Sequence, residues 1–279
     1  MKSNNPEVSI IMSVHNGENF VTDAINSILN QTFRNFEFLI FDDGSKDGSL
    51  NEIKKFNDKR IKLYSFNDNK GLAFRLNQGV DLAKGKYIAR MDDDDISHPE
   101  RLKKQFDFMK KNPDYDLISS RCITISQNKK ILSELPFKET HCQICKYPFI
   151  SFYMPHPAWF GKRSWFIKHP YIYPSSFLSE DQELLLKTYK KSKFYSISEH
   201  LLAYRLKGNI PLKKLFKINN ALFLSQIKKF YKEKNFIYMF LSTITYLFRN
   251  FITLFPYTKF YKHKNIDFKD NFNWEKLIM

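Results

Sequence analysis

The first 91 residues alternate between short apolar segments and longer amphipathic ones, and this alternation restricts the fold more than any other feature. The short segments, rich in β-branched and aromatic residues, are residues 8–14, 36–41, 61–66 and 87–91. The segments between them, with apolar side chains at helical spacing, are residues 19–31, 49–56 and 72–83. Short apolar runs are typical of strands buried on both faces, and strands separated by helices usually pair in parallel. The pattern therefore predicts an α/β fold with a mostly parallel sheet flanked by helices.

Polar residues directly follow the predicted strands. His15 and Asn16 follow the first strand, Asp42 and Asp43 the second, and four aspartates at residues 92–95 the fourth. Ligands of open parallel sheets bind outside the carboxyl ends of the strands, so we expect these groups to meet at one edge. Asp43, followed by Gly and Ser, equally suits an Asx-turn or a helix N-cap, so its position alone leaves both roles open.

The four consecutive aspartates are the densest cluster of charge in the chain. Carboxylates this close repel one another unless a cation lies among them, which favours a divalent metal ion; a solvated acidic turn is the alternative. Pro99 stands where the first residue of a helix would, and this places the aspartates in a loop. The chain contains neither glycine-rich phosphate-binding motif of dinucleotide enzymes and P-loop proteins. A metal-bridged diphosphate fits these carboxylates better.

Composition and charge narrow the range of partners. With 279 residues and 43% apolar content, the chain can form one large domain, or a domain with an appendage. The formal charge of +16 suggests an anionic partner such as nucleic acid, a phosphorylated substrate or an acidic membrane, although genome base composition alone would also enrich lysine. Three cysteines are too few for a disulfide framework and the N-terminus does not resemble a signal peptide, so we expect a reducing compartment.

Four motifs resemble those of one known family in order and spacing. They are residues 8–16, Gln31-Thr32-Phe33 with Phe36-Glu37, residues 42–48 and residues 91–96. Together they resemble the family 2 inverting glycosyltransferases of the GT-A fold, strongly over residues 6–120 and more loosely to residue 206. The resemblance implies a Rossmann-like GT-A catalytic domain at residues 1–207, with a nucleotide-sugar half at 1–120 and an acceptor half at 121–207. It also implies a UDP-sugar donor and a divalent metal cofactor, Mn²⁺ or Mg²⁺.

The resemblance places several residues around the nucleotide-sugar. Asp43 would accept a hydrogen bond from the uracil N3–H group, and Ser13 and His15 would lie against the base. Asp92 would lie near the ribose, and Asp93 would either point away from the metal ion or help to hold the sugar. These five residues are the predicted nucleotide-sugar-binding set.

The resemblance also divides the aspartate run between the metal ion and the loop. Asp92 and Asp94 match the first and last positions of the family's Asp-x-Asp motif, and both are predicted metal ligands. Asp94 is the stronger candidate of the two. Asp95 would instead steady the loop before the helix that begins near Pro99.

A carboxylate pair in the second half of the chain is the candidate for the catalytic base. Inverting transfer needs a group that deprotonates the acceptor hydroxyl, and a carboxylate is sufficient. Glu180-Asp181 resembles the family's Glu-Asp motif and predicts Asp181 as the base; a pair that only complements a helix N-terminus is the alternative. His156 resembles a residue lining the acceptor side, although lone histidines are often structural. Glu180 and Arg205, which matches a late Tyr-Arg element, are expected on the acceptor or phosphate side. Lys207, in place of the residue expected there, predicts a contact with phosphate.

Residues 208–279 differ in character from the rest of the chain. Residues 211–234 have the pattern of a basic amphipathic helix, whereas residues 236–255 are rich in aromatic side chains and are interrupted by Arg249 and Asn250. The uninterrupted apolar part is shorter than the roughly 18 residues that a membrane-spanning helix needs. A helical extension that lies on an anionic membrane surface and one that packs on the catalytic domain are both consistent with this pattern.

The sequence thus predicts a metal-dependent inverting glycosyltransferase. It would transfer a sugar from a UDP-sugar to a saccharide or lipid-linked acceptor in the synthesis of bacterial surface polysaccharide or lipooligosaccharide. We expect a cytoplasmic protein, peripheral on the inner face of the bacterial membrane. A metal-dependent nucleotidyltransferase would use the same carboxylates but gives no role to Glu180 and Asp181. A nucleic-acid-binding module would leave the carboxylates unexplained, and no nucleic-acid partner is expected. The donor sugar and its acceptor are not specified by the sequence.

Overall fold

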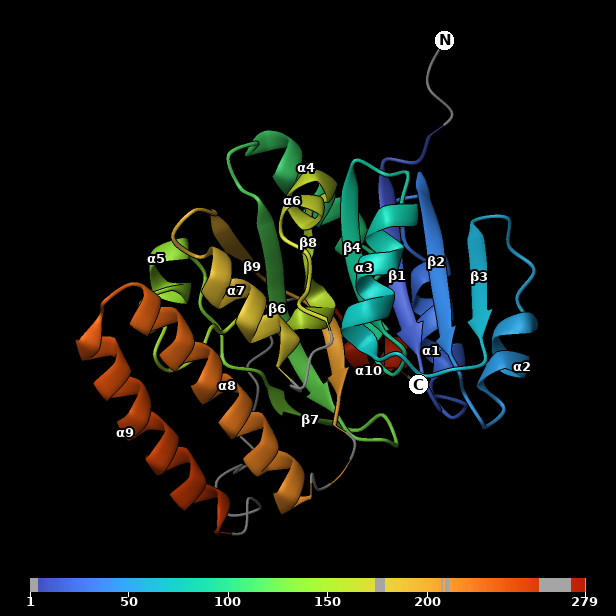
Figure 1. The fold of residues 1–279 in the computed structure, drawn as a ribbon. Helices are drawn as coiled ribbons and strands as arrows, with labels where there is room; N and C mark the ends of the chain where they lie inside the picture. The colour runs from blue at the N-terminus through green and yellow to red at the C-terminus, as the bar shows by residue number, and fades with distance from the viewer. Residues whose placement is uncertain (1–4, 174–178, 207, 209–210, 256–271, 279) are drawn as a thin grey trace.

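One curved, mixed sheet organises the chain (Figure 1). The computed structural model describes residues 5–173, 179–206, 208, 211–255 and 272–278. The sheet has the strand order β3-β2-β1-β4-β8-β6-β9-β5, with β7 paired to β6. Its strands are β1 (Val8–Val14), β2 (Phe36–Asp43), β3 (Ile61–Phe66), β4 (Tyr87–Asp92), β5 (Ile96–Ser97), β6 (Leu117–Ile125), β7 (Ile131–Glu134), β8 (Phe160–Lys162) and β9 (Phe194–Arg205).

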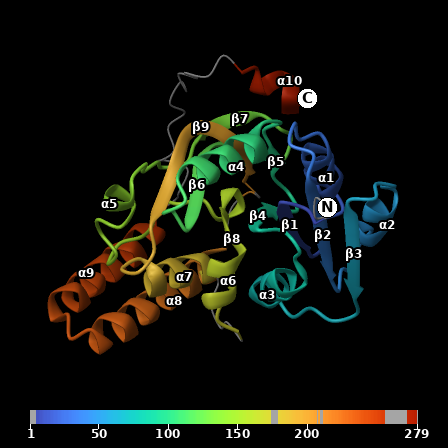
Figure 2. The same ribbon diagram turned by 90° about the horizontal axis from the view of Figure 1, so that it is seen from above.

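Helices cover both faces of this sheet (Figure 2). They are α1 (Val21–Leu29), α2 (Ser49–Lys54), α3 (Leu72–Leu82), α4 (Arg101–Lys111), α5 (His141–Ile144), the 3-10 helix η1 (His156–Ala158), α6 (Arg163–Lys168), α7 (Glu180–Thr188), α8 (Leu212–Lys232), α9 (Phe236–Thr253) and α10 (Trp274–Ile278). The strands and helices expected in the first 91 residues are all present, and their ends lie within two residues of the expected ones.

The first half of the sheet is parallel, as the alternation predicts. β3, β2, β1 and β4 are neighbours with parallel pairing throughout. In the second half, β6 and β9 are parallel, but β8 runs antiparallel to both β4 and β6, and β5 runs antiparallel to β9. The sheet is therefore mixed rather than mostly parallel beyond β4, because short strands and turns replace the long helical crossovers there.

Alternation along β1 explains how the layers form. Ile10 and Met12 face one side, where α1, α2 and α4 pack, and Ile11 faces the other, where α3, α6 and α7 pack. All three side chains are almost fully buried. A strand that is covered on both faces reads as a continuous apolar run, which is why the sequence predicts it so clearly.

The C-terminal region forms a helical hairpin, α8 and α9, at one end of the molecule (Figure 1). α8 packs beside α7, and its Phe230 is fully buried in the core on that face of the sheet. α10 lies apart from the hairpin and inserts Trp274 among residues of β5, β6 and β9. The expectation that this region packs on the catalytic domain therefore holds for α8 and α10. Every helix among the described residues is too short or too polar to span a membrane.

Candidate active site

The ends of β1, β2 and β4 bring the predicted nucleotide-side residues together. The strand register places Ser13 of β1 opposite Asp92 of β4. His15, two residues further on, shares a hydrogen bond through Nδ1 with the carbonyl oxygen of Asp43 at 3.0 Å. Its backbone N–H donates to Asp93 Oδ2 at 3.4 Å. These five residues are thus neighbours at one sheet edge, as the strand order predicts.

Asp43 is more constrained than the sequence indicates. Its buried carboxylate accepts hydrogen bonds from the backbone N–H groups of Lys70 and Gly71 at 2.9 and 2.8 Å, and from Arg75 Nε at 2.6 Å. Arg75 is itself buried and stacks over Phe66, with 3.6 Å between the guanidinium carbon and the ring centroid. Asp43 therefore orders the loop before α3, and the sequence gives no sign of this partner.

Asp42 forms the Asx-type turn that the sequence left open as an alternative for Asp43. Asp42 Oδ1 accepts a hydrogen bond from the backbone N–H of Ser45 at 3.2 Å, which is an Asx-type turn. The helix α2 begins beyond it, and its N-cap, Gly48, makes no side-chain capping bond. Asp43 is thus not needed for this turn, and its role at the base stays a prediction.

Three of the four consecutive aspartates converge. Oxygen atoms of Asp92, Asp94 and Asp95 lie within 4.8 Å of one another, whereas Asp93 is directed towards the loop after β1. Asp95 is fully buried, and its Oδ2 has no hydrogen-bond partner among the described residues. Burial, followed by the charges of Asp94 and Asp92, raises the pKa of Asp95 well above its usual value. A divalent cation with a preference for oxygen ligands would relieve both the repulsion and the unpaired oxygen, so the donor set fits Mn²⁺ or Mg²⁺.

Arg205 holds this cluster in place instead of facing the acceptor or a phosphate. Its side chain is fully buried, and Nε donates to the carbonyl oxygen of Asp94 at 2.6 Å. Its other nitrogens donate to the carbonyl oxygens of Ser126 and Gln127 and to Asp23. Its backbone N–H donates to Asp95 Oδ1 at 2.8 Å. The prediction for Arg205 is therefore corrected to a structural role, because its donors are already occupied.

Lys207, the other predicted phosphate contact, lies outside the described residues. Its role stays a prediction from the sequence.

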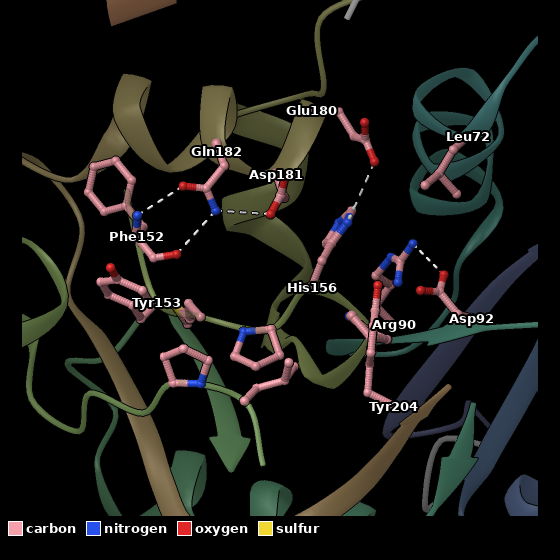
Figure 3. A pocket seen from close by; sticks show the side chains of 15 residues that line it. Leu72, Arg90, Asp92, Phe152, Tyr153, His156, Glu180, Asp181, Gln182 and Tyr204 are labelled. Atoms are coloured by element: carbon pink, nitrogen blue, oxygen red, sulfur yellow. Dashed lines mark hydrogen bonds and ion pairs between the residues drawn. The ribbon is translucent and has the colours of Figure 1, made fainter. Parts of the chain in front are cut away.

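A cavity of about 390 Å³ joins the aspartate cluster to the predicted catalytic pair (Figure 3). Arg90 on β4 lies between them; its Nη2 is 2.5 Å from Asp92 Oδ1. Arg90 is buried, and its Nε and Nη1 have no hydrogen-bond partner in the described part of the chain. Burial alone would lower the pKa of Arg90, but the Asp92 carboxylate outweighs it and raises that pKa. Arg90 therefore places a buried, permanent cation beside the cavity.

The acidic pair at the start of α7 lines the opposite side of the cavity, as predicted. Burial, followed by the Asp181 charge, raises the pKa of Glu180 from 4.5 to about 7. Burial also raises the pKa of Asp181, although a hydrogen bond from Gln182 Nε2 to its Oδ2 at 3.1 Å opposes this shift. Two adjacent carboxylates in such surroundings do not readily ionise together, so one of them can hold a proton near neutral pH.

His156 also lines the cavity, next to this pair. Its Nε2 shares a 2.8 Å hydrogen bond with the hydroxyl group of Tyr171, and its Nδ1 is 3.8 Å from Glu180. Burial, followed by the Arg90 charge, lowers the pKa of His156 well below 6.5, so the ring is neutral at neutral pH. A neutral, fixed imidazole suits substrate positioning better than proton transfer.

The remaining wall of the cavity is largely apolar. Its side chains come from three segments distant in the sequence: Leu72, Leu135, Pro136, Phe152 and Met154. The sequence gives no periodic signal for this wall, because most of these residues lie in the irregular middle of the chain. An apolar wall opposite charged groups is typical of a small-molecule site.

Comparison with known proteins identifies the family. The model for "Glycosyl transferase family 2" matches residues 9–169, more than half of the chain. The chain belongs to glycosyltransferase family 2. An uncharacterized glycosyltransferase of Methanocaldococcus jannaschii is 36% identical over 207 residues, which cover 72% of this transferase and 71% of that protein. The O-antigen biosynthesis glycosyltransferase WbnJ of Escherichia coli is 34% identical over 206 residues, which cover 71% and 79% of the two chains.

Solved structures confirm that the transferase has the GT-A fold. S. aureus TarS in complex with UDP aligns with a TM-score of 0.61 at 19% identity, over 79% of this transferase and 65% of that chain. The mannosyltransferase PcManGT from Pyrobaculum calidifontis, in complex with GDP-Man and Mn²⁺, aligns with a TM-score of 0.64 at 12% identity. That alignment covers 90% of this transferase and 73% of PcManGT. The transferase therefore spans slightly less than two thirds of the TarS chain.

Proposed function

We propose that this protein transfers a sugar from a UDP-sugar, with inversion, to a hydroxyl group of a saccharide or lipid-linked saccharide. The observation that carries the proposal is the cavity lined both by Asp92, a member of the aspartate cluster, and by the carboxylate pair at the start of α7. One end suits a metal-bound diphosphate and the other a proton acceptor. Membership in family 2 argues against both a nucleotidyltransferase and a nucleic-acid-binding module.

The donor in this proposal is supported by what related structures contain. TarS has been solved with UDP and with UDP-GlcNAc, and PcManGT with GDP-Man. All three complexes contain a nucleoside diphosphate, which carries a sugar in two of them, and this supports a nucleotide-sugar donor. A uridine nucleotide is the finer part of the proposal. Asp43 would accept from the base N–H, with Ser13 and His15 beside it, because the loop that Arg75 orders keeps Asp43 in place.

The proposed metal ion would be held by Asp94 and Asp92, joined by Asp95. When bound, the ion would neutralise charge that develops on the departing diphosphate. PcManGT was solved with Mn²⁺, and the all-oxygen donor set here suits Mn²⁺ or Mg²⁺ equally. Arg90 would hold Asp92 in place from the side of β4.

Asp181 is the proposed general base. Its Oδ2 accepts from Gln182, which leaves Oδ1 to take the proton from the acceptor hydroxyl. Glu180 would hold a proton near neutral pH, which reduces the repulsion that full ionisation of the pair would create. His156, fixed by Tyr171, would orient the acceptor against the apolar wall.

The acceptor's place in metabolism is the broadest part of the proposal. WbnJ is named for O-antigen biosynthesis, which supports a surface polysaccharide or lipooligosaccharide product. The predicted position on the inner face of the bacterial membrane belongs to the same proposal.

A panel of UDP- and GDP-sugars with Mn²⁺, analysed by mass spectrometry, tests the proposal. We expect turnover of a UDP-sugar that EDTA abolishes. Asp181→Asn should reduce transfer by at least about 100-fold while donor affinity, measured by calorimetry, stays unchanged. Asp114→Asn, at a side chain that is 82% exposed, is the matched control. Substantial transfer by the Asp181 variant would refute the base, and turnover of GDP-sugars alone would refute the uridine donor.

A further inference from the structure

The helix α9 exposes a continuous apolar face. Seven side chains of α9 are exposed, and all seven are large and apolar. Two more exposed apolar side chains follow directly after the helix. They are Phe236, Ile237, Phe240, Ile244, Leu247, Phe248, Phe251, Leu254 and Phe255. At about 100° per residue these positions fall within an arc of roughly 120° on one side of the helix. Scattered exposed apolar residues are normal on soluble proteins, but a continuous stripe of this length marks an interaction surface.

The face of α9 that contacts the protein is mixed: Tyr238 and Met239 pack on the core, and polar side chains lie among them. The buried side chains of α9 are Ser242 and Thr253. Asn250 accepts a hydrogen bond from Asn219 Nδ2 of α8 at 2.9 Å, and Arg249, the helix's single charged residue, donates to the carbonyl oxygen of Ile150 at 2.5 Å. A surface helix in water usually turns its most apolar stripe inward. α9 instead satisfies polar groups within the protein, beside Tyr238 and Met239, and leaves its largest apolar stripe exposed.

The neighbouring helix supplies positive charge. α8 lies alongside α9 in the hairpin (Figure 1), and its exposed residues include Lys213, Lys214, Lys217, Lys228 and Lys232. Lysine side chains beside an apolar surface can keep their ammonium groups at the level of lipid headgroups while their stems follow the apolar surface. A second copy of the chain would bring an equally basic α8 towards this one, which is unfavourable. An anionic bilayer complements both the apolar face and the lysines.

We propose that α9 lies in the interface of an anionic phospholipid bilayer, with its apolar face in the acyl region and the α8 lysines at the headgroups. Burial of apolar side chains makes the larger contribution to this contact, and the attraction between lysines and anionic headgroups makes the smaller one. The sequence pattern alone drew attention to the lysines. A helix with such a face binds in the plane of the interface without crossing the membrane. The contact needs neither donor nor acceptor, so it stands or falls independently of sugar transfer.

Vesicle flotation of the full chain tests this contact. We expect the chain to float with phosphatidylcholine vesicles that contain phosphatidylglycerol. The variant Phe240→Ser, Leu247→Ser, Phe251→Ser should lose at least about tenfold in vesicle partitioning, because three inserted side chains are removed. Because these side chains are 59 to 66% exposed, the substitutions should leave the fold intact, which thermal unfolding verifies.

Matched variants separate the outcomes. Leu82→Ser with Ile167→Ser, at exposed apolar positions on α3 and α6, should float like the unmodified chain. Lys213→Gln with Lys217→Gln should weaken binding to anionic vesicles more than to neutral ones. Equal flotation of the α9 triple variant and the unmodified chain would overturn the proposal. A second outcome would also overturn it. In that outcome the unmodified chain does not bind vesicles but forms a dimer in sedimentation velocity, and the triple variant abolishes that dimer.

Discussion

Replacement of Glu180 by Gln tests the electrostatics of the catalytic pair directly. The pKa of Glu180 is about 7 in the fold against 4.5 in its ordinary state. At about 1.4 kcal/mol per pH unit, that difference corresponds to roughly 3 kcal/mol of preference for the protonated form. Gln has nearly the shape of a protonated Glu and cannot ionise. The variant therefore mimics the form that the cavity favours.

The sign of the effect follows from proton linkage. Between pH 4.5 and about 7 the unfolded chain has already lost this proton while the folded chain retains it. The folded state then binds more protons, so the stability of the native protein falls as the pH rises through this window. Above about pH 7 the full penalty is present. Glu180→Gln removes the penalty and should stabilise the protein at pH 8 but hardly at pH 4.5.

Thermal unfolding of the apo protein from pH 4.5 to 8.5 measures this difference. We expect equal midpoints at the acidic end and a variant that is more stable by roughly 5 °C at pH 8, at about 2 °C per kcal/mol for a chain of this size. Asp114→Asn, an exposed carboxylate, should show no such divergence. Parallel curves for Glu180→Gln and the unmodified protein would refute the reasoning, since they would mean that Glu180 ionises in the fold as it does in water.

Two further predictions concern the aspartate cluster. Asp95→Asn retains an oxygen for the Arg205 amide but removes one charge, so Mn²⁺ affinity measured by calorimetry should fall by on the order of tenfold or more. Asp93→Asn, outside the cluster, should leave that affinity almost unchanged, and equal losses would contradict the assignment. Arg205→Met removes a buried cation with several hydrogen bonds and should cost about 3–5 kcal/mol of unfolding free energy in urea. The control is Arg34→Met near the surface; a comparable loss there would show that the Arg205 contacts are not the cause.

The parallel half of the fold could be predicted because β1, β2 and β4 are buried on both faces. The segment predicted at residues 8–14 coincides with β1, an almost continuous apolar run, and residues 61–66 coincide with β3, a partly buried edge strand. Helix ends were less well defined: residues 19–31 were expected where α1 covers Val21–Leu29, because flanking turns continue the helical spacing. Beyond β4, the strands β5, β7 and β8 are short, and irregular segments separate the longer β6 from β9, which leaves little periodicity to read.

The site could be predicted in position but not in detail. The register of parallel strands brings His15, Asp43 and Asp92 to one edge, and this follows from the strand order alone. The partners of these groups come from distant parts of the chain. No local pattern therefore shows that Arg75 donates a hydrogen bond to Asp43. The same applies to Arg205, which the sequence suggested as a phosphate ligand and which the fold buries against the aspartate loop.

The two C-terminal helices show why amphipathic spacing alone cannot assign a helix to a surface. Periodicity establishes that a helix has two faces, but it does not say which face meets the protein. In α8 the answer is the usual one, with Phe230 inward and Lys228 outward. In α9 the hydrogen bond between Asn219 and Asn250, and that of Arg249 to the chain before η1, hold these polar side chains inward. Satisfying those buried polar groups directs the aromatic face outward, where only an apolar medium would stabilise it.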